Sequence, residues 1–345
     1  MMNFWISSSK VIVFFAILGI FFACGGKKHA QHEEIDKELA ALYQKIDRSP
    51  KDAKLYLQLS SYFLDKGLLD SALNASLVAL KLDSNNSDIY LQVADIYFAK
   101  RDLTSVEEVL KKAIALDKNN NDARLKLSEF YFLVRDYEQS ENLLIETIKL
   151  LPYNPKAYHL LGMNYQEEND TVNAIKAYLM ALEQDADYFE ACENLGVLYA
   201  QNLNPLAIDH YKNALRIRPD DPQILYNIAM FYQESGNYDQ AVEYYKKMLQ
   251  LNRKNQFALH NIGWIYLQTN RFREAVTFFT QAIEIDTIYT AAIFNRGLAF
   301  ESLKDYSKAR QDYMYTLRWS ENDPLAIEAL NRLDSLQKKK NNLKK

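Results

Sequence analysis

A pattern of small residues that recurs every 34 positions constrains the fold of this chain more than any other feature. Eight segments align end to end over residues 53–323 of the 345, seven of them with 34 residues and one with 33. The twentieth place is small in seven segments, and the eighth place is small in all of them. The eighth-place residues are Ser60, Ala94, Ser128, Gly162, Gly196, Ala229, Gly263 and Gly297. A fixed period of this length indicates stacked units that bury their cores only against neighbours.

Each segment is typical of two antiparallel helices joined by a tight corner. Small side chains are needed where the two backbones approach, and an aromatic residue at the eleventh place of every segment would fill the gap against the next helix. The sixteenth place holds an oxygen-bearing residue that could cap the second helix in five segments: Asp102, Asp136, Asp170, Asn237 and Asp305. The chain has 24 Tyr and 17 Phe but only 9 Gly and 7 Pro, which favours long helices with short corners.

The pattern resembles the tetratricopeptide repeat over about four fifths of the chain. This resemblance implies an all-α fold, a right-handed superhelical solenoid of eight tetratricopeptide repeats with helical caps. The expected repeats are 53–86, 87–120, 121–154, 155–188, 189–221, 222–255, 256–289 and 290–323. Apolar residues on one helical face predict an N-terminal capping helix over 35–52 and a C-terminal one over 324–337. Residues 338–345 form a basic tail, expected to be a solvated end.

The N-terminus has the pattern of an export signal. Lys10 precedes 12 apolar or small residues at 11–22, too short a run to span a bilayer. The following Phe21-Phe22-Ala23-Cys24 resembles a bacterial lipobox, which implies a lipoprotein signal peptide over 1–23 and lipidation of Cys24. Residues 24–34 would then be the lipidated cysteine and a flexible polar tether. The alternative is an uncleaved hydrophobic tail that carries a chance cysteine.

The resemblance to lipoproteins places the protein in the envelope of a bacterium, lipid-anchored to a membrane. Several acyl chains on one cysteine would anchor it stably, since each buried methylene contributes about 0.8 kcal/mol. Lys27-Lys28 differs from the lysine-plus-acidic signal that sends some lipoproteins to the cell surface. We therefore expect attachment to the outer membrane with the repeats facing the periplasm.

The residues offer no basis for catalysis. Every glycine beyond the signal and tether lies at the eighth place or at a corner, so none remains for a phosphate-binding loop or a nucleophile elbow. No two of the five histidines form a helical ligand pair, and two cysteines exclude a four-cysteine metal site. A net charge of −4 gives no basic field for nucleic acid. We expect no enzyme activity, cofactor, metal, small-molecule substrate or nucleic-acid partner.

An amide recurs at the sixth place of the last four repeats, as Asn194, Asn227, Asn261 and Asn295. The resemblance implies that this place faces a concave groove, and the row is similar to the asparagine ladder in the tetratricopeptide region of the O-linked N-acetylglucosamine transferases. An amide offers both donors and acceptors to an extended peptide backbone. Neighbouring places hold aromatic and imidazole side chains that could anchor a peptide: Tyr226, His260, Trp264 and Phe294. The alternatives are that asparagine is simply common at this place across the family and that the rings pack between helices.

The resulting hypothesis is a membrane-anchored scaffold or adaptor lipoprotein that binds a protein or peptide partner in the concave groove. An alternative is a permanent structural subunit of an envelope secretion, motility or outer-membrane assembly complex. That alternative predicts large hydrophobic contacts outside the groove and copurification at fixed stoichiometry.

Overall fold

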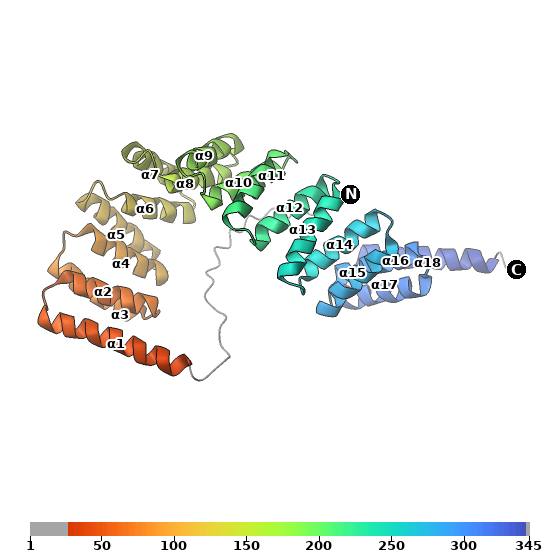
Figure 1. The fold of residues 1–345 in the computed structure, drawn as a ribbon, viewed down its shortest axis with the longest axis horizontal. Coiled ribbons are helices and arrows are strands. Elements are labelled where there is room, and N and C mark those ends of the chain that lie inside the picture. Colours follow the sequence, from red (N-terminus) through yellow and green to blue (C-terminus); the bar gives the residue numbers. More distant parts are fainter. Residues whose placement is uncertain (1–26, 343–345) are drawn as a thin grey trace. The chain divides into compact units, whose positions relative to one another are not determined.

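The computed structural model describes the backbone of residues 27–342 and the side chains of residues 37–338. Within that range the chain consists of helices and corners and contains no strand, which confirms the all-α fold (Figure 1). The predicted signal peptide and Cys24 lie outside the described residues. The helices are α1 Lys27–Arg48, α2 Ala53–Asp65, α3 Leu69–Leu82, α4 Ser87–Ala99, α5 Leu103–Leu116, α6 Asn121–Leu133, α7 Tyr137–Leu150, α8 Pro155–Glu167, α9 Thr171–Gln184, α10 Phe189–Ala200, α11 Leu206–Ile217, α12 Pro222–Glu234, α13 Tyr238–Leu251, α14 Gln256–Gln268, α15 Phe272–Ile285, α16 Thr290–Ser302, α17 Tyr306–Trp319 and α18 Pro324–Asn342.

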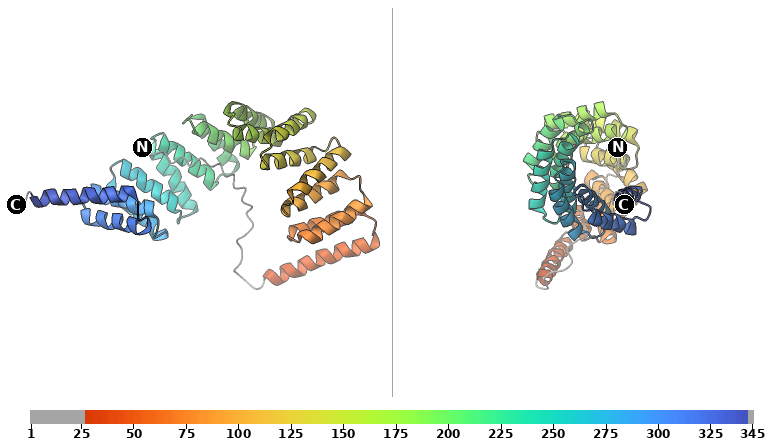
Figure 2. Two further views of the ribbon diagram at one scale, coloured as in Figure 1. Left: turned by 180° about the vertical axis from the view of Figure 1, so that it is seen from behind. Right: turned by 90° about the vertical axis from the view of Figure 1, so that its right-hand side faces the viewer.

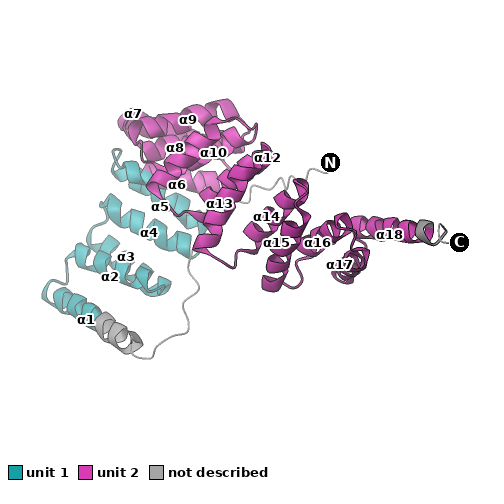
Figure 3. Ribbon diagram, turned by 45° about the vertical axis from the view of Figure 1, so that its right-hand side comes forward, with its two compact units in different colours: residues 1–123 teal, residues 124–345 magenta. Residues whose placement is uncertain are grey.

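The helices form two compact units, residues 1–123 and 124–345, here called unit 1 and unit 2 (Figure 3). In unit 2 the helix pairs follow one another, each beside the next (Figure 2). The first helices of neighbouring repeats contact each other, α10 with α12 and α14 with α16. Among the described helices, no two second helices of neighbouring repeats make comparable contact. The first helices of unit 2 therefore lie on the inner side of its bend.

The predicted ends of the array need correction. Helix α1 begins at Lys27, so the prediction of a flexible tether is wrong for residues 27–34, which are helical. No Gly or Pro follows Gly26 until Pro50, and helix formers dominate the segment. Helix α1 ends at Arg48 instead of residue 52, because a residue before proline disfavours helical geometry. At the other end, α18 continues to Asn342, five residues past its predicted end, through three lysines that favour helix and two asparagines.

Local capping explains where the helices begin. The first helix of each pair starts at the residue that opens each aligned segment, from Ala53 to Thr290. Four of the five predicted caps are confirmed, since each side chain accepts from the backbone N–H three residues on: Asp102, Asp136, Asp170 and Asp305. Asn237 occupies the cap position without a side-chain bond, so that prediction is wrong.

All eight corners contain one residue with φ between 51° and 77°, at the fifteenth place of each repeat. Only Gly67 and Gly236 are glycines. In two of the other six corners the residue is an asparagine, Asn169 or Asn270, which tolerates left-handed geometry. Arg101, Arg135, Leu203 and Lys304 adopt it at a cost of about 1 kcal/mol or more. The corner is thus set by the packing of its two helices and not by a local glycine signal.

The eighth-place residue of each repeat packs against the twenty-fourth-place residue of its second helix. A Cβ added at Gly162 would lie 2.5 Å from the Tyr178 ring, and one at Gly263 would lie 2.8 Å from the Phe279 ring. The pairs Gly196–Tyr211 and Gly297–Tyr313 are equally close. Where the twenty-fourth place holds a residue smaller than Tyr or Phe, the eighth place holds a residue larger than glycine. Such pairs include Ala94 with Leu110 in the second repeat and the hydrogen-bonded Ser60 with Ser76 in the first. The two places are complementary in size in seven repeats, and repeat six, with Ala229 and Tyr245, is the exception.

We predict that Gly263→Ala lowers the free energy of unfolding by about 1–3 kcal/mol, because its methyl group would overlap the Phe279 ring. Adding Phe279→Leu should recover most of the loss, since Ala and Leu occupy these places in the second repeat. Urea unfolding followed by circular dichroism measures both variants. A single variant as stable as the wild type would show that the ring does not limit the approach of the two helices.

Candidate functional site

The eight groove residues predicted from the sequence lie on α10, α12, α14 and α16, the first helices of repeats five to eight. All eight side chains are partly buried. They are Asn194, Asn227, Asn261, Asn295, Tyr226, His260, Trp264 and Phe294. The structure brings them together on the inner side of the bend in unit 2, and their partners distinguish the residues that hold the array from those open to a ligand.

A directed chain of hydrogen bonds joins repeats six, seven and eight. Asn295 Nδ2 donates to His260 Nε2 at 3.0 Å, and His260 Nδ1 donates to Asn261 Oδ1 at 3.2 Å. Asn261 Nδ2 donates to Tyr245 Oη at 3.0 Å, and that hydroxyl donates to Gln233 Oε1 at 3.0 Å. The sequence of donors and acceptors assigns the Nδ1–H tautomer to His260.

The same link recurs between repeats four and five, where Asn194 Nδ2 donates to His159 Nε2 at 3.0 Å. Asn227 differs, because its Oδ1 accepts from Gln223 Nε2 one turn earlier on the same helix, at 2.9 Å. Three of the four asparagines therefore tie one repeat to its neighbour. Among the described residues, Asn227 is the one amide of the four whose side chain bonds only within its own helix, and it remains the amide most open to a ligand.

In repeats four, six, seven and eight the place-five side chain packs on the aromatic ring at place 24 of the same repeat. The ring centroids of His260 and Phe279 are 5.6 Å apart, and those of Phe294 and Tyr313 are 5.5 Å apart. His159–Tyr178 and Tyr226–Tyr245 pair similarly. The interpretation of these aromatics as interhelical packing is supported for place five. Trp264, at place nine, meets Tyr238 edge to face at 6.2 Å.

Two residues of this face were missed by the sequence reasoning. Phe257, at place two of repeat seven, is 57% exposed and has one edge-to-face contact with Tyr289 at 6.1 Å. Glu193 holds place five of repeat five, where the other repeats of this region hold a ring. The break in the aromatic series at Glu193 was the signal that could have identified it.

Burial controls the ionisation of the groove histidines. His159 is 8% exposed, and burial lowers its pKa to about 4, with Glu190 and Lys156 acting in opposite directions. Burial also lowers the pKa of His260, opposed by its bond to Asn261. Both imidazoles are therefore neutral at pH 7, as acceptance of a hydrogen bond at Nε2 requires.

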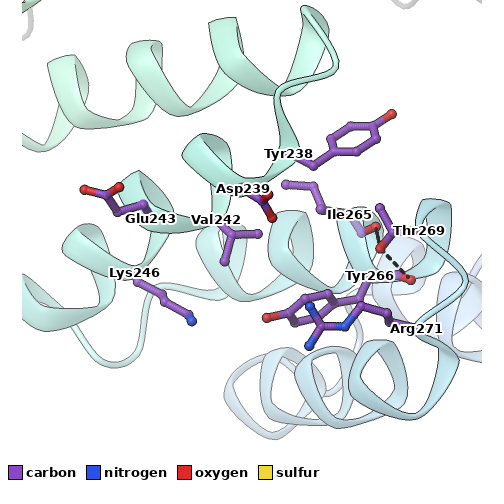
Figure 4. Close-up of a pocket in the computed structure, with 9 residues that line it drawn as sticks. All are labelled: Tyr238, Asp239, Val242, Glu243, Lys246, Ile265, Tyr266, Thr269 and Arg271. Carbon is purple, nitrogen blue, oxygen red and sulfur yellow. Dashed lines mark hydrogen bonds between the residues drawn. The ribbon is translucent and has the colours of Figure 1, made fainter.

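A separate pocket of about 360 Å³ opens between α13 and α14 (Figure 4). The guanidinium of Arg271 lies over the Tyr266 ring at 4.2 Å and donates to Glu274 at 3.0 Å. Glu243 pairs with Lys247 at 2.8 Å. The α14 residues that line the pocket hold places 10, 11 and 14, so it is distinct from the surface of places two, five and nine. Of the four charged residues that line it, Arg271 and Glu243 are paired, and no group of metal-binding side chains occurs in the described part of the chain.

Comparison with known families agrees with this geometry. Models described as tetratricopeptide repeat match residues 87–120, 155–188, 220–288 and 260–327, and one described as TPR repeat matches 197–236. Together they match more than half of the chain. The chain belongs to the tetratricopeptide repeat family.

Relatives of this tetratricopeptide repeat protein include the photosystem I assembly protein Ycf3. The Synechococcus elongatus protein is 32% identical over 110 residues, which cover 27% of this chain and 64% of that protein. The Synechococcus sp. protein is 31% identical over 98 residues, covering 26% and 57%. The matches thus span less than two thirds of these relatives' length.

Solved structures share the fold. The C-terminal part of a TPR repeat-containing protein from Cytophaga hutchinsonii is 18% identical, with a TM-score of 0.61 over 69% of this chain and 98% of that one. Pseudomonas aeruginosa pilF is 18% identical, with a TM-score of 0.51 over 58% and 92%. Among the helices that the structure describes, none is long and apolar enough to cross a membrane.

Acid should destabilise this repeat array through His159. Its pKa is about 6.5 in an unfolded chain and about 4 in the fold, so between these values the unfolded state binds more protons. The resulting stability is complete above pH 6.5 and is lost as the pH falls towards 4. From pH 7 to 5 this one group should cost about 2 kcal/mol. Urea unfolding at both pH values should show a smaller loss for His159→Gln, and an equal loss would contradict the assignment.

Asn261→Ala should lower the free energy of unfolding by about 1–3 kcal/mol, because it leaves His260 Nδ1 without an acceptor and removes the donor to the Tyr245 hydroxyl. Asn227→Ala is the matched control and should cost less than about 0.5 kcal/mol, since it loses only a bond within one helix. Thermal and urea unfolding compare the two. Equal losses of stability in the two variants would contradict the role of Asn261 as a link between repeats.

Proposed function

We propose that this protein is a lipid-anchored scaffold that binds an extended protein or peptide segment on the first-helix face of repeats six and seven. The observation that carries the proposal is the set of apolar and amide side chains open on that face. Phe257 is mostly exposed, while Tyr226, Met230 and Trp264 are partly exposed beside Asn227. Aromatic groups with an adjacent polar group are the usual anchors of recognition surfaces.

In the proposed binding mode, the apolar side chains and the amide contact different parts of the bound segment. Trp264 and Phe257 supply apolar area for the side chains of the bound segment. Asn227 supplies a donor and an acceptor that match the alternating N–H and C=O groups of an extended backbone. Because the hydrogen-bonded chain through His260 already fixes the neighbouring helices, little conformational entropy is lost on binding.

The membrane anchor is the second part of the proposal. Lipidation of Cys24 would confine the repeats to a bilayer surface and raise the effective concentration of partners there. We place the anchor in the outer membrane with the repeats facing the periplasm. Ycf3 is named for the assembly of photosystem I, and we propose an adaptor or assembly role for this chain without catalysis, cofactor or nucleic acid.

A permanent structural subunit of an envelope complex is a second candidate, favoured by apolar side chains exposed near the C-terminal end. Met314 and Trp319 of α17 and Leu325 of α18 are each more than half exposed. A partner built permanently onto this end would copurify at fixed stoichiometry through detergent and salt washes. An adaptor would be recovered in substoichiometric amounts.

The groove is tested with peptides selected from a random displayed library on the full-length chain in detergent micelles. For a selected peptide, Trp264→Ala should weaken binding about 10- to 30-fold, as expected for a central aromatic anchor. Val172→Ala on α9, far along the chain from repeats six and seven, is the control and should leave the affinity unchanged. Calorimetry measures all three proteins. Unchanged affinity in the Trp264 variant would exclude this face as the binding surface.

The anchor is tested by Cys24→Ser. Lipidation occurs on the thiol, so this variant should take up no labelled fatty acid and should retain its signal peptide. Metabolic labelling followed by mass spectrometry of the N-terminus measures both effects. Undiminished labelling in the variant would contradict the lipoprotein proposal.

A further inference from the structure

The fifth repeat breaks two rules that its neighbours obey. In repeats four, six, seven and eight the place-five side chain is a ring packed at a tilt against the aromatic residue at place 24. In repeat five the corresponding residues are Glu193 on α10 and Tyr211 on α11. A carboxylate thus takes the position of a ring, next to a tyrosine that is packed against Gly196.

The second rule concerns the tyrosine hydroxyl. In repeats four, six and eight this hydroxyl donates to the place-twelve side chain, at 2.9, 3.0 and 2.6 Å: Gln166, Gln233 and Glu301. Where place twelve is Leu267, in repeat seven, the ring is Phe279 and has no hydroxyl. In repeat five place twelve is Ala200, yet the hydroxyl of Tyr211 is retained.

Tyr211 is therefore a polar side chain without an internal partner. It is 2% exposed, and no hydrogen bond to its hydroxyl occurs within the described residues. By analogy with its three counterparts, this hydroxyl is directed towards the first-helix face. Glu193 holds the position whose rings lie with their centroids 5.5–6.4 Å from the counterparts of Tyr211 in the other repeats. Glu234 ends α12, a helix that contacts both α10 and α11. Burial raises the pKa of Tyr211, and the carboxylates of Glu193 and Glu234 raise it further.

The charge around this hydroxyl is not balanced. Burial raises the pKa of Glu193, and the carboxylates of Asp221 and Glu190 raise it further. The only nearby cation that acts on it, Arg218, pairs with Glu190 at 3.0 Å and lies over the Phe189 ring at 3.6 Å. Neither Glu193 nor Glu234 forms an ion pair within the described part of the chain.

We propose that Glu193, Glu234 and the Tyr211 hydroxyl form a subsite for a lysine or arginine side chain of the bound segment. The nitrogen of such a side chain is a donor only, so it can satisfy the hydroxyl oxygen and both carboxylates together. An organic cation fits better than a metal ion, since no cluster of metal-ligating side chains is found over the described residues. The subsite rests on the proposed function and extends that groove towards repeat five.

The test uses selection from a random twelve-residue displayed library on the full-length chain in detergent micelles. Peptides selected on the wild type should carry Lys or Arg at one fixed position, and peptides selected on Glu193→Gln should not. In a selected peptide, changing that Lys to norleucine should weaken binding to the wild type about tenfold and to Glu193→Gln less than about twofold. Glu284→Gln, an exposed carboxylate on α15, is the control and should behave as the wild type.

Tyr211→Phe separates the hydroxyl from the packing. Phe279 shows that a phenyl ring fits against glycine at this place, so the variant should fold and lose part of the preference for a basic residue. Peptides selected on the wild type without a basic preference, or a preference that persists in Glu193→Gln, would overturn the subsite and leave the groove standing. Failure to select any peptide on the wild type would overturn both.

Discussion

The close approach of an aromatic ring to a small residue is the constraint on which unit 2 depends. In four of its repeats, glycine at place eight admits the ring of the second helix almost to the backbone of the first. That approach sets the crossing of the two helices within a repeat. It also carries the far end of the ring through to the first-helix face, where a tyrosine hydroxyl meets the side chain at place twelve. The packing inside each repeat thereby determines which polar groups reach the first-helix face.

The groove residues have two physical tasks, and the structure assigns them differently. His260, Asn261 and Asn295 hold neighbouring repeats through bonds of 3.0–3.2 Å and have little capacity left for a ligand. Such neighbour-to-neighbour links suit a stack in which each repeat contacts only the adjacent ones. Recognition then falls to side chains that this network leaves open, chiefly Phe257, Trp264 and Asn227. The recurring amide is explained in large part by cohesion between repeats.

Much of the fold could be predicted from the sequence because it depends on residue size and period. The small residues at place eight and the helix caps such as Asp102 and Asp305 were readable, since each acts through local geometry. The left-handed corners at Arg101 and Lys304 were not, because packing of the flanking helices imposes them on residues with no such preference. The ends of α1 and α18 depended on helix propensity outside the repeat pattern.

The site was less predictable because the role of its residues depends on hydrogen bonds to partners about 35 residues away. The position of Asn194 could be read from the period, but its bond to His159 depends on how two first helices are offset. Glu193 could be recognised in the sequence as a break in the aromatic series, but its place opposite Tyr211 followed only from the ring pairs of the other repeats. The residue type shows which bonds a side chain can form. Its neighbours in the structure determine whether the side chain holds repeats together or is free to bind a partner.

Photo-crosslinking in intact cells tests the central claim most directly. A photoreactive benzoylphenylalanine replaces Phe257 on the first-helix face in one protein and Val172 on α9 in another; both positions are exposed. The groove account predicts a covalent adduct from position 257 that maps by mass spectrometry to one continuous segment of a partner, with none from position 172. Adducts from position 172 without any from position 257 would contradict it.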